Sequence, residues 1–311
     1  MNEPLIDMRA WRQFLAVAEE LHFGRAAQRL HITQPPLTQA IAQLEKTLGV
    51  ALFERTSRRV LLTPAGEALL PDVRDLLARA QALPARARAA AQGEVGHVRL
   101  AFVSTVGFEQ LPAWVRAFRE QCPQVALDLV EATGDVQLRM LERGEIDAGL
   151  LLHTPSQAPV GLAHLRVRTE PLVLALPEHH ALAQAPVLAW NAVLPEPLVI
   201  FPRRIAPSLH DAVVGIYHAA GRQPVVAQEA IQMQTIVNLV SAGIGVAWVP
   251  ESVVQFRRSG VVYRTPAAAP RRKVPVCETG MVWRAGDVTP AVARFIAFVR
   301  AQTAVGDIAP V

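Results

Sequence analysis

The sequence predicts an α/β protein in which a helical module and a long helix precede a larger α/β region of two similar halves. Apolar residues recur at helical spacing over residues 5–49 and again from residue 64 to about residue 93. From residue 98 onward, strand-like apolar segments alternate with helical ones. The chain has 311 residues, of which 51% are hydrophobic, so it is long enough for two or three domains and unlike a disordered chain.

Three helices are predicted at the start of the chain, over residues 5–20, 24–30 and 33–49. In the third, Thr33 is the expected N-cap, with a hydroxyl that can accept hydrogen bonds from the first free amides. Gly49 is expected to end this helix. One face of the helix is apolar and predicts burial of Leu37, Ala40, Ile41, Leu44 and Leu48.

A β-hairpin and a long helix are predicted next. Two short extended segments, 52–53 and 60–62, flank a turn at 56–59. Thr63 and Pro64 then have the N-cap and first-turn pattern of a helix that runs toward Gly93 and is expected to pack against a partner helix. Because a proline removes a main-chain hydrogen bond, we expect a bend or break near Pro84, with a second proline at Pro71.

The alternation that follows predicts a mostly parallel, open sheet in two halves with a cleft between them. The first half has expected strands at 98–103, 125–131 and 148–152, and helices at 110–121 and 135–143. The second half has expected strands at 172–176, 198–201, 225–229 and 246–250, and helices at 208–220 and 233–242.

Charge and composition narrow the class of function. Segment 21–60 holds six basic and two acidic residues, so its net charge is +4. The whole chain also has a net charge of +4, so the positive excess is concentrated in this segment, as a nucleic-acid-binding module requires. The nine histidines and two cysteines show no zinc-ligand spacing, so we expect no metal site, and Cys122 and Cys277 are expected to be buried and reduced. No catalytic constellation, membrane segment or export signal is visible, so we expect neither an enzyme nor a membrane or exported protein.

The free face of the third helix carries short uncharged side chains that suit the edges of DNA bases. Glutamine pairs with adenine, and threonine contacts the thymine methyl group. Arginines on the hairpin suit phosphates. The predicted DNA-binding residues are Gln34, Pro35, Pro36, Thr38, Gln39, Arg55, Arg58 and Arg59. By composition alone, an ordinary three-helix unit with a solvated polar face fits equally well.

The string from Ala26 to Ile41 resembles the LysR-type transcriptional regulators. So do Leu44-Glu45, Leu48-Gly49, Leu52-Phe53-Glu54-Arg55 and Leu62-Thr63-Pro64-Ala65-Gly66, in the order and spacing of that family. Pro35-Pro36 resembles the subgroup that responds to intermediates of aromatic catabolism. The family usually has serine and then arginine or glutamine after Pro-Pro-Leu, where this chain has Thr38 and Gln39.

The resemblance implies a winged helix-turn-helix over 1–63, a linker helix over 64–93, and a periplasmic-binding-protein-like effector domain over 94–311. The two subdomains would be about 94–165 plus 268–303 and about 166–267. In open α/β sheets, ligands bind beyond the carboxyl ends of strands, where hydroxyls and free amides favour an anion. The predicted effector-binding residues are Ser104, Thr105, Thr133, Phe201, Pro202 and Arg203, and the resemblance supports all of them except Arg203. Helix capping by the hydroxyls, and a solvent-facing Arg203, remain alternatives.

The resemblance further implies partners. These are double-stranded promoter DNA, a second or further copies of the chain in a homodimer or homotetramer, and RNA polymerase, all in the cytoplasm. The expected ligand is a small carboxylate effector, with no other cofactor, that closes the cleft and alters the spacing of the DNA-binding heads. Two alternatives are a solute-binding protein or enzyme on the same two-lobed fold, and a DNA-architectural protein without a small ligand.

Overall fold

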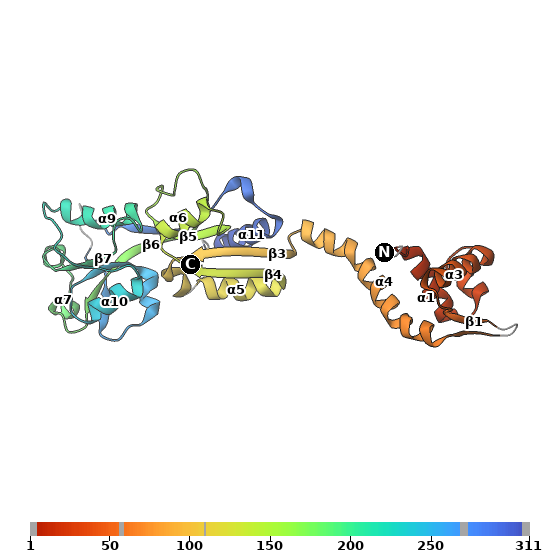
Figure 1. Cartoon of the computed structure of the whole chain (residues 1–311). Helices are drawn as coiled ribbons and strands as arrows, with labels where there is room; N and C mark the ends of the chain where they lie inside the picture. The colour runs from red at the N-terminus through yellow and green to blue at the C-terminus, as the bar shows by residue number, and fades with distance from the viewer. Residues whose placement is uncertain (1–4, 56–58, 109, 268–272, 307–311) are drawn as a thin grey trace. The chain divides into compact units, whose positions relative to one another are not determined.

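The computed structural model describes residues 5–55, 59–108, 110–267 and 273–306, with side chains to residue 303. The chain forms two compact units, Met1–Arg88 and Ala89–Val311. Figure 1 shows the helices and strands of each unit. None of the helices in the described ranges is both long enough and apolar enough to span a membrane.

The first unit is a three-helix bundle with a short hairpin. Helix α1 (Met8–Glu20), α2 (Phe23–Arg29) and α3 (Gln34–Leu48) precede the antiparallel strands β1 (Phe53–Arg55) and β2 (Val60–Leu62). The three predicted helices and the hairpin are confirmed. Helix α1 begins at Met8 rather than at Leu5, because the Asp7 side chain caps it by accepting a hydrogen bond from the Arg9 amide.

The prediction that the Thr33 hydroxyl caps α3 is wrong. Thr33 holds the N-cap position but makes no side-chain cap hydrogen bond. An N-cap side chain accepts from the amides of the second or third helical residue, and these are Pro35 and Pro36, which have no N–H. Gly49 ends the helix as expected, with a left-handed φ of 70°.

Helix α4 (Pro64–Ala91) is 28 residues long and begins at a well-formed cap. The Thr63 hydroxyl accepts from the Gly66 amide at 3.1 Å and donates to the Ala51 carbonyl at 2.7 Å. The helix continues through Pro71 and Pro84, so of the bend or break expected near Pro84 the break does not occur. Figure 1 shows α4 as a single curved helix. Each proline removes one main-chain hydrogen bond, and the remaining bonds of the helix suffice to continue it.

The second unit contains a seven-stranded sheet in the order β10-β6-β11-β5-β3-β4, with β9 also paired to β6. Its strands are β3 (Val95–Phe102), β4 (Gln124–Glu131), β5 (Ala148–His153), β6 (Ala163–Pro177), β9 (Ala247–Pro250), β10 (Val261–Arg264) and β11 (Val276–Trp283). Strand β3 runs parallel to β4 and β5, but β11 is antiparallel to β5 and β6, and β6 is antiparallel to β9 and β10. The sheet is therefore mixed, and the prediction of a mostly parallel sheet is wrong.

Two lobes form around separate cores. Lobe I contains β3, β4, β5, the 3-10 helix η1 (Ser104–Phe108) and helices α5 (Gln110–Gln121), α6 (Gly134–Glu142) and α11 (Pro290–Gly306). Lobe II contains the parallel pair β7 (Leu198–Ile200) and β8 (Val226–Glu229), together with β9, β10, α7 (Ala181–Gln184), α8 (Trp190–Val193), α9 (Pro207–His218) and α10 (Met233–Ser241). The predicted elements of both halves are present, as are several that the alternation did not indicate.

Strands β6 and β11 cross from one lobe to the other. In β6, Val167 is buried in the core of lobe I and Leu172 in that of lobe II. In β11, Met281 belongs to lobe I and Cys277 to lobe II. The predicted boundary at residues 165 and 166 thus falls inside a continuous strand. Its first half alternates apolar and polar residues over 163–168, a strand pattern that sequence reasoning missed.

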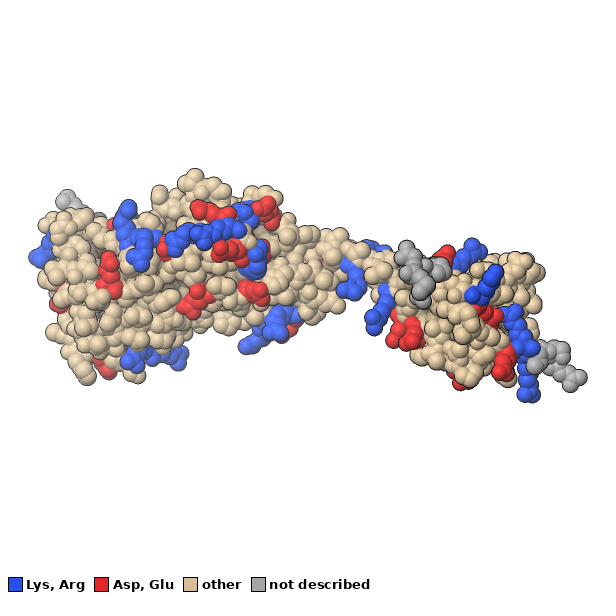
Figure 2. All heavy atoms as spheres, viewed as in Figure 1, with Lys and Arg blue, Asp and Glu red and all other residues tan. Residues whose placement is uncertain are grey.

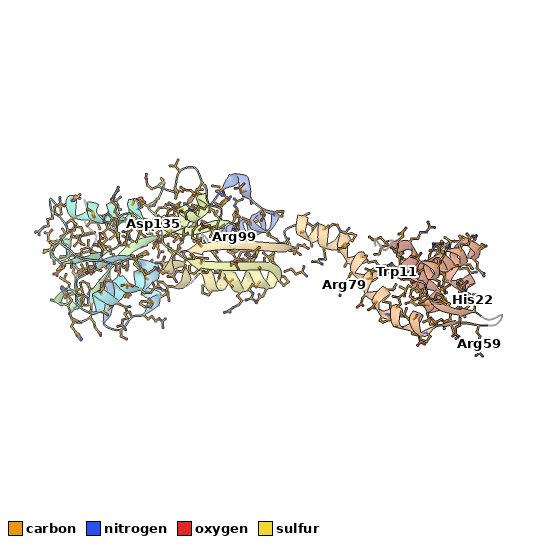
Figure 3. All side chains as sticks on the ribbon, in the orientation of Figure 1. Trp11, His22, Arg59, Arg79, Arg99 and Asp135 are labelled. Atoms are coloured by element: carbon orange, nitrogen blue, oxygen red, sulfur yellow. The ribbon has the colours of Figure 1, made fainter. Side chains whose placement is uncertain are left out.

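An ion pair in lobe I joins β3 to the residue that precedes β5. Arg99 on β3, labelled in Figure 3, places Nη2 2.7 Å from Oδ1 of Asp147, and its Nη1 donates to the Gly144 carbonyl at 2.7 Å. The Arg99 amide also donates to Asp147. These bonds fix the turn that leads into β5.

Candidate nucleic-acid interface and ligand pocket

Helices α2 and α3 are joined by a tight turn. His31 adopts a left-handed φ of 55°, and the Ile32 amide donates to the Ala27 carbonyl at 3.0 Å. Leu37 and Ile41 are fully buried against α1 and α2. One face of α3 is therefore held by the bundle core, and the opposite face is left to solvent, as a recognition helix requires.

All five residues predicted on α3 lie at the solvent-facing start of the helix. Gln34, Pro35, Pro36 and Gln39 are exposed, and Thr38 is half-buried. The Thr38 hydroxyl donates to the Gln34 carbonyl at 3.1 Å. Its proton is used within the helix, so toward an outside partner Thr38 offers its methyl group and acceptor lone pairs.

The hairpin arginines differ in their surroundings. Arg55 pairs with Glu45 on α3 at 3.0 Å, and its guanidinium lies over the Phe23 ring at 4.8 Å from the centroid. Arg58 lies outside the described residues. Arg59 is exposed at the described end of the hairpin, where Figure 3 labels it. Arg55 thus joins the hairpin to the bundle.

Acidic residues of α1 lie beside the basic residues of α2. Glu19 pairs with Arg29 at 2.8 Å and with Arg74 of α4 at 3.2 Å, and its hydrogen bond raises the pKa of Arg29. Glu20 pairs with Arg25 at 3.4 Å. Figure 2 accordingly shows red and blue side chains side by side on this unit. The segment 21–60 begins just after these two glutamates, so its charge excess overstates the local positive charge.

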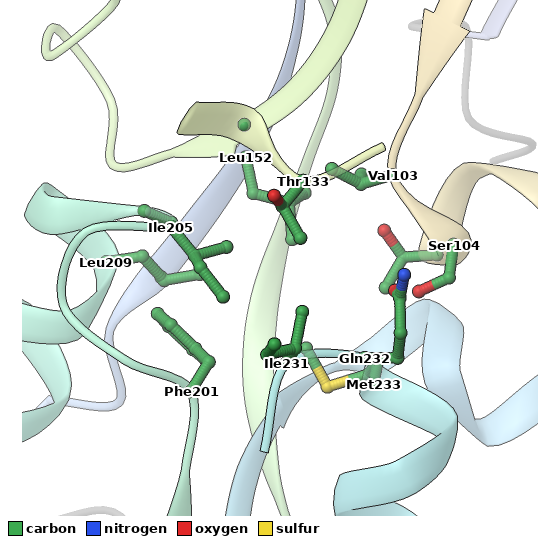
Figure 4. Close-up of a pocket in the computed structure, with 13 residues that line it drawn as sticks. Val103, Ser104, Thr133, Leu152, Phe201, Ile205, Leu209, Ile231, Gln232 and Met233 are labelled. Carbon is green, nitrogen blue, oxygen red and sulfur yellow. The ribbon is translucent and has the colours of Figure 1, made fainter. Parts of the chain in front are cut away.

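A pocket lies between the two lobes of the second unit (Figure 4). It encloses about 460 Å³ including its open mouth. Lobe I contributes residues at the ends of β3 and β5 and the start of α6, and lobe II contributes the loop after β7 and the start of α10. The lining residues are Val103, Ser104, Thr105, Thr133, Gly134, Leu152, Phe201, Ile205, Ala206, Leu209, Ile231, Gln232 and Met233.

Four of the six residues predicted for ligand binding line this pocket, namely Ser104, Thr105, Thr133 and Phe201. Pro202 is buried beside it without lining it. Arg203 is directed to Asp211 on α9, with hydrogen bonds of 2.8 and 2.7 Å. That hydrogen bond lowers the pKa of Asp211 to about 2, so the guanidinium is already matched to a protein carboxylate.

The hydroxyls of the pocket are not equivalent. Thr133 donates to Asp135, so its proton is used within the first turn of α6. Oγ1 of Thr105 is buried and has no hydrogen-bond partner among the described residues. A buried hydroxyl without a partner costs free energy, and a ligand that accepts its hydrogen bond would recover that cost.

Gln232 is a pocket residue that sequence reasoning missed. It is the N-cap residue of α10 and follows β8 by three positions. In Figure 4 its side chain and that of Ser104 point toward one another from opposite lobes. The rule that ligands bind beyond the carboxyl ends of strands, applied to β8 as it was to β3, would have found it.

Two family models match this chain. The model "Bacterial regulatory helix-turn-helix protein, lysR family" matches residues 8–67, and the model "LysR substrate binding domain" matches residues 91–304. The chain is similar to the HTH-type transcriptional regulator IlvR of Caulobacter vibrioides, with 48% identity over 92% of this chain and 94% of that one. It is 38% identical to the HTH-type transcriptional regulator AlsR of Bacillus subtilis, over 83% and 85% of the two chains.

Solved structures of similar proteins include one with DNA. The crystal structure of CbnR, a LysR family transcriptional regulator, has a TM-score of 0.77 at 32% identity and covers 95% of this chain and 100% of that one. Full-length CbnR complexed with its target DNA has a TM-score of 0.79 at 31% identity, over 96% and 100% of the two chains.

Proposed function

Because this chain belongs to the LysR family of DNA-binding transcriptional regulators, and is therefore not an enzyme, we propose that a small carboxylate bound between its lobes controls its activity. The ligand would bridge lobe I and lobe II and favour the closed arrangement of the two. In this proposal, ligand binding and DNA binding are coupled sites of one molecule.

The observation that carries the proposal is the hydroxyl of Thr105. The residue is only 5% exposed, and its hydroxyl has no hydrogen-bond partner among the described residues. Ser104 and the Gln232 amide supply further donors at the same end of the pocket. The first amides of α6, which begins at Gly134, have no helical partners and favour negative charge. Together these donors suit a carboxylate, although no charged side chain of the described residues lines the pocket.

The apolar wall of the pocket indicates which kind of chemical group the rest of the ligand carries. Phe201, Ile205, Leu209, Leu152 and Met233 are apolar, as the walls of small-molecule sites usually are. We therefore expect a carboxylate with a hydrocarbon or aromatic body. Arg203, held by Asp211, has no direct part in this proposal, and Pro202 shapes the loop after β7.

A thermal-shift panel of benzoate, isobutyrate, pyruvate and muconate tests the proposal. A ligand that binds only the folded state raises the melting temperature. We expect at least one of these carboxylates to raise it for the wild type, and Thr105→Val to remove at least half of that shift. Thr265→Val, at an exposed threonine after β10 that lines neither this pocket nor the groove beside Glu278, is the matched control. A shift that Thr105→Val leaves intact would contradict the assignment of Thr105.

For DNA, we propose that Gln34, Pro35, Pro36, Thr38 and Gln39 contact base edges in the major groove. The exposed start of α3 supports this assignment, since recognition helices place their first residues on bases. Arg58 and Arg59 on the hairpin are proposed to contact phosphates, which position the protein without selecting sequence. Arg55 is proposed to act chiefly by holding the hairpin in place.

Gln39→Ala and Gln43→Ala form a matched pair for this proposal. Both glutamines are exposed on α3, but Gln43 lies one turn further from its start. Loss of a base contact costs about 1–3 kcal/mol, so Gln39→Ala should weaken operator binding about tenfold or more relative to nonspecific DNA. Gln43→Ala should change that ratio less than threefold. Equal losses in gel-shift titrations would show that Gln39 is not a specificity residue.

Self-assembly is proposed to use α4. Leu76 and Leu83 are exposed, at 42% and 60%, and because they lie seven residues apart they share one face of this helix. A homodimer or homotetramer in the cytoplasm, acting on RNA polymerase at promoter DNA, is the expected assembly. Sedimentation of the wild type against Leu83→Lys tests it. We expect the variant to shift toward monomer, and an unchanged oligomer would exclude this face.

A further inference from the structure

Two histidines and a glutamate from three neighbouring strands meet in lobe I, outside the pocket described above. His153 ends β5, His164 lies near the start of β6, and Glu278 lies on β11 between them. Oε1 of Glu278 is 3.2 Å from Nε2 of His164 and 3.7 Å from Nε2 of His153. All three ligand atoms lie within 4.8 Å of one another.

His153 is held in the orientation of a metal ligand. Its Nδ1 lies 2.8 Å from the Thr154 carbonyl oxygen, which can only accept, so Nδ1 carries the proton. Nε2 is then a lone-pair donor, and it is buried without a hydrogen-bond partner in the described residues. A histidine whose second nitrogen donates to a main-chain carbonyl is typical of metal sites, because that bond fixes the tautomer and the ring.

Gly280 on β11 leaves the space into which both imidazoles turn. A Cβ atom at this position would lie 2.5 Å from Nε2 of His153 and 2.7 Å from Nε2 of His164. Such distances are far below van der Waals contact, so any other residue would displace both rings. The convergence of the two nitrogens therefore depends on the glycine.

We propose that His153, His164 and Glu278 form a three-ligand site for a divalent transition-metal ion of the Zn²⁺ type. Tetrahedral bonds of about 2.0–2.1 Å to nitrogen and oxygen place neighbouring ligand atoms about 3.3 Å apart. The two distances to Glu278 bracket this value, and a small rotation of the His153 ring would complete the set. Two imidazoles and one carboxylate suit Zn²⁺, Co²⁺ or Ni²⁺, whereas Mg²⁺ and Ca²⁺ require oxygen ligands.

The fourth coordination position would open to solvent. His164 and Glu278 line a surface groove together with Arg166, Arg168, Arg300 and Thr303. The positive arginines oppose a bare cation, and the Glu278 carboxylate offsets part of that repulsion. They favour an anion as the fourth ligand, so a metal-bound hydroxide or carboxylate fits this groove better than neutral water.

A purely structural triad is the competing explanation. In it, Glu278 would accept a hydrogen bond from His164, and the cluster would only join three strands. That explanation leaves the buried Nε2 of His153 unpaired, at a cost of about 1–3 kcal/mol. Metal coordination uses all three groups. The three residues meet because β5, β11 and β6 are neighbours in the sheet, although they are far apart in the sequence. For this reason the spacing of histidines in the sequence predicted no metal site.

The proposal is tested on untagged, full-length protein stripped of metal. Titration with Co²⁺ should give the visible bands of a tetrahedral ion, and calorimetry with Zn²⁺ should give one site per chain. His164→Gln and Glu278→Gln should each weaken Zn²⁺ binding at least about tenfold, the lower end of what loss of a supporting group costs. Mg²⁺ should not compete.

His97→Gln is the matched control, because His97 lies 2.6 Å from Asp128 on the surface of the same lobe, as a histidine–carboxylate pair. It should leave the affinity and the Co²⁺ spectrum unchanged. Gly280→Ala keeps all three ligands and should abolish the spectrum, with circular dichroism confirming that the variant folds. The proposal is overturned if no tetrahedral Co²⁺ spectrum forms, or if His97→Gln lowers the affinity as much as His164→Gln does.

Discussion

The guanidinium of Arg55 is bound to the carboxylate of Glu45, with Nη2 3.0 Å from Oε2. The other oxygen of Glu45 accepts from the amides of Leu52 and Phe53, at 2.9 and 3.1 Å. One side chain of α3 therefore holds both the start of β1 and Arg55, the residue at its end. The angle between the recognition helix and the hairpin depends on Glu45.

Removal of Glu45 should loosen the hairpin more than removal of Arg55. Glu45→Ala leaves two partly buried amides without partners, and we expect a loss of about 2 kcal/mol in local stability. Arg55→Ala removes an exposed ion pair and a cation–π contact, worth about 1 kcal/mol together. Hydrogen exchange of the amides in β1 and β2 measures both losses. Glu54→Ala, at an exposed neighbour, is the control, and a larger effect of Arg55→Ala would reverse this ranking.

The hairpin arginines should govern the salt dependence of DNA binding. Each phosphate contact releases counterions and contributes about 0.9 to the slope of log K against log salt concentration. Arg59→Ala and Arg58→Ala should each lower that slope by about 1 per DNA-binding head and weaken binding alike on all sequences. Arg143→Ala, which removes an exposed charge in lobe I, controls for net charge. An unchanged slope would exclude the substituted arginine from phosphate contact.

The Arg203–Asp211 pair predicts a pH dependence separate from ligand binding. Asp211 has a pKa of about 2, below its ordinary value of 3.8, chiefly because Arg203 donates a hydrogen bond to it. The pair therefore stabilises the fold above pH 4, and this contribution is lost as the pH falls toward 2. In Arg203→Ala, NMR titration should show the Asp211 pKa rising toward 3.8, while carboxylate binding at pH 7 persists. Loss of that binding would place Arg203 in the ligand site.

Two helical glycines should respond in opposite directions to substitution by alanine. A Cβ on Gly66, in the first turn of α4, would overlap the Leu52 carbonyl oxygen and the Leu62 side chain. Gly66→Ala should therefore destabilise the first unit by about 1–3 kcal/mol. Gly215 in α9 has open space around its Cβ position, so Gly215→Ala should stabilise lobe II by about 0.4–1 kcal/mol. Hydrogen exchange of each helix gives the sign.

Local patterns accounted for most of the secondary structure. The apolar spacing of Leu37, Ile41 and Leu44 fixed which face of α3 is buried, because that spacing acts within one helix. Strand ends preceding Ser104 and Thr133 indicated the pocket for a similar reason, since the carboxyl ends of parallel strands meet at one edge. The prediction that the Thr33 hydroxyl caps α3 was wrong because Pro35 and Pro36 have no amide hydrogen to donate to it.

Local patterns could not predict which strands pair when they lie far apart in the sequence. The first half of β6 alternates apolar and polar residues as a strand does, but nothing within residues 163–171 indicates that its antiparallel partner is β11. The same pairing changes the sheet from parallel to mixed and joins the two lobes by continuous strands. Whether Arg203 meets a ligand or Asp211 likewise depends on the fold of α9.

The sequence by itself determined the winged helix-turn-helix string, the long helix and the two α/β halves, because those signals come from residues close together in the chain. Tertiary structure decided which side chains meet across the chain. It directed Arg55 to Glu45, left the Thr105 hydroxyl unpaired in a pocket, and gathered His153, His164 and Glu278 on three strands. The physical reason is that a hydrogen bond or ion pair acts over a few ångströms, and only the packed fold brings distant residues within that range.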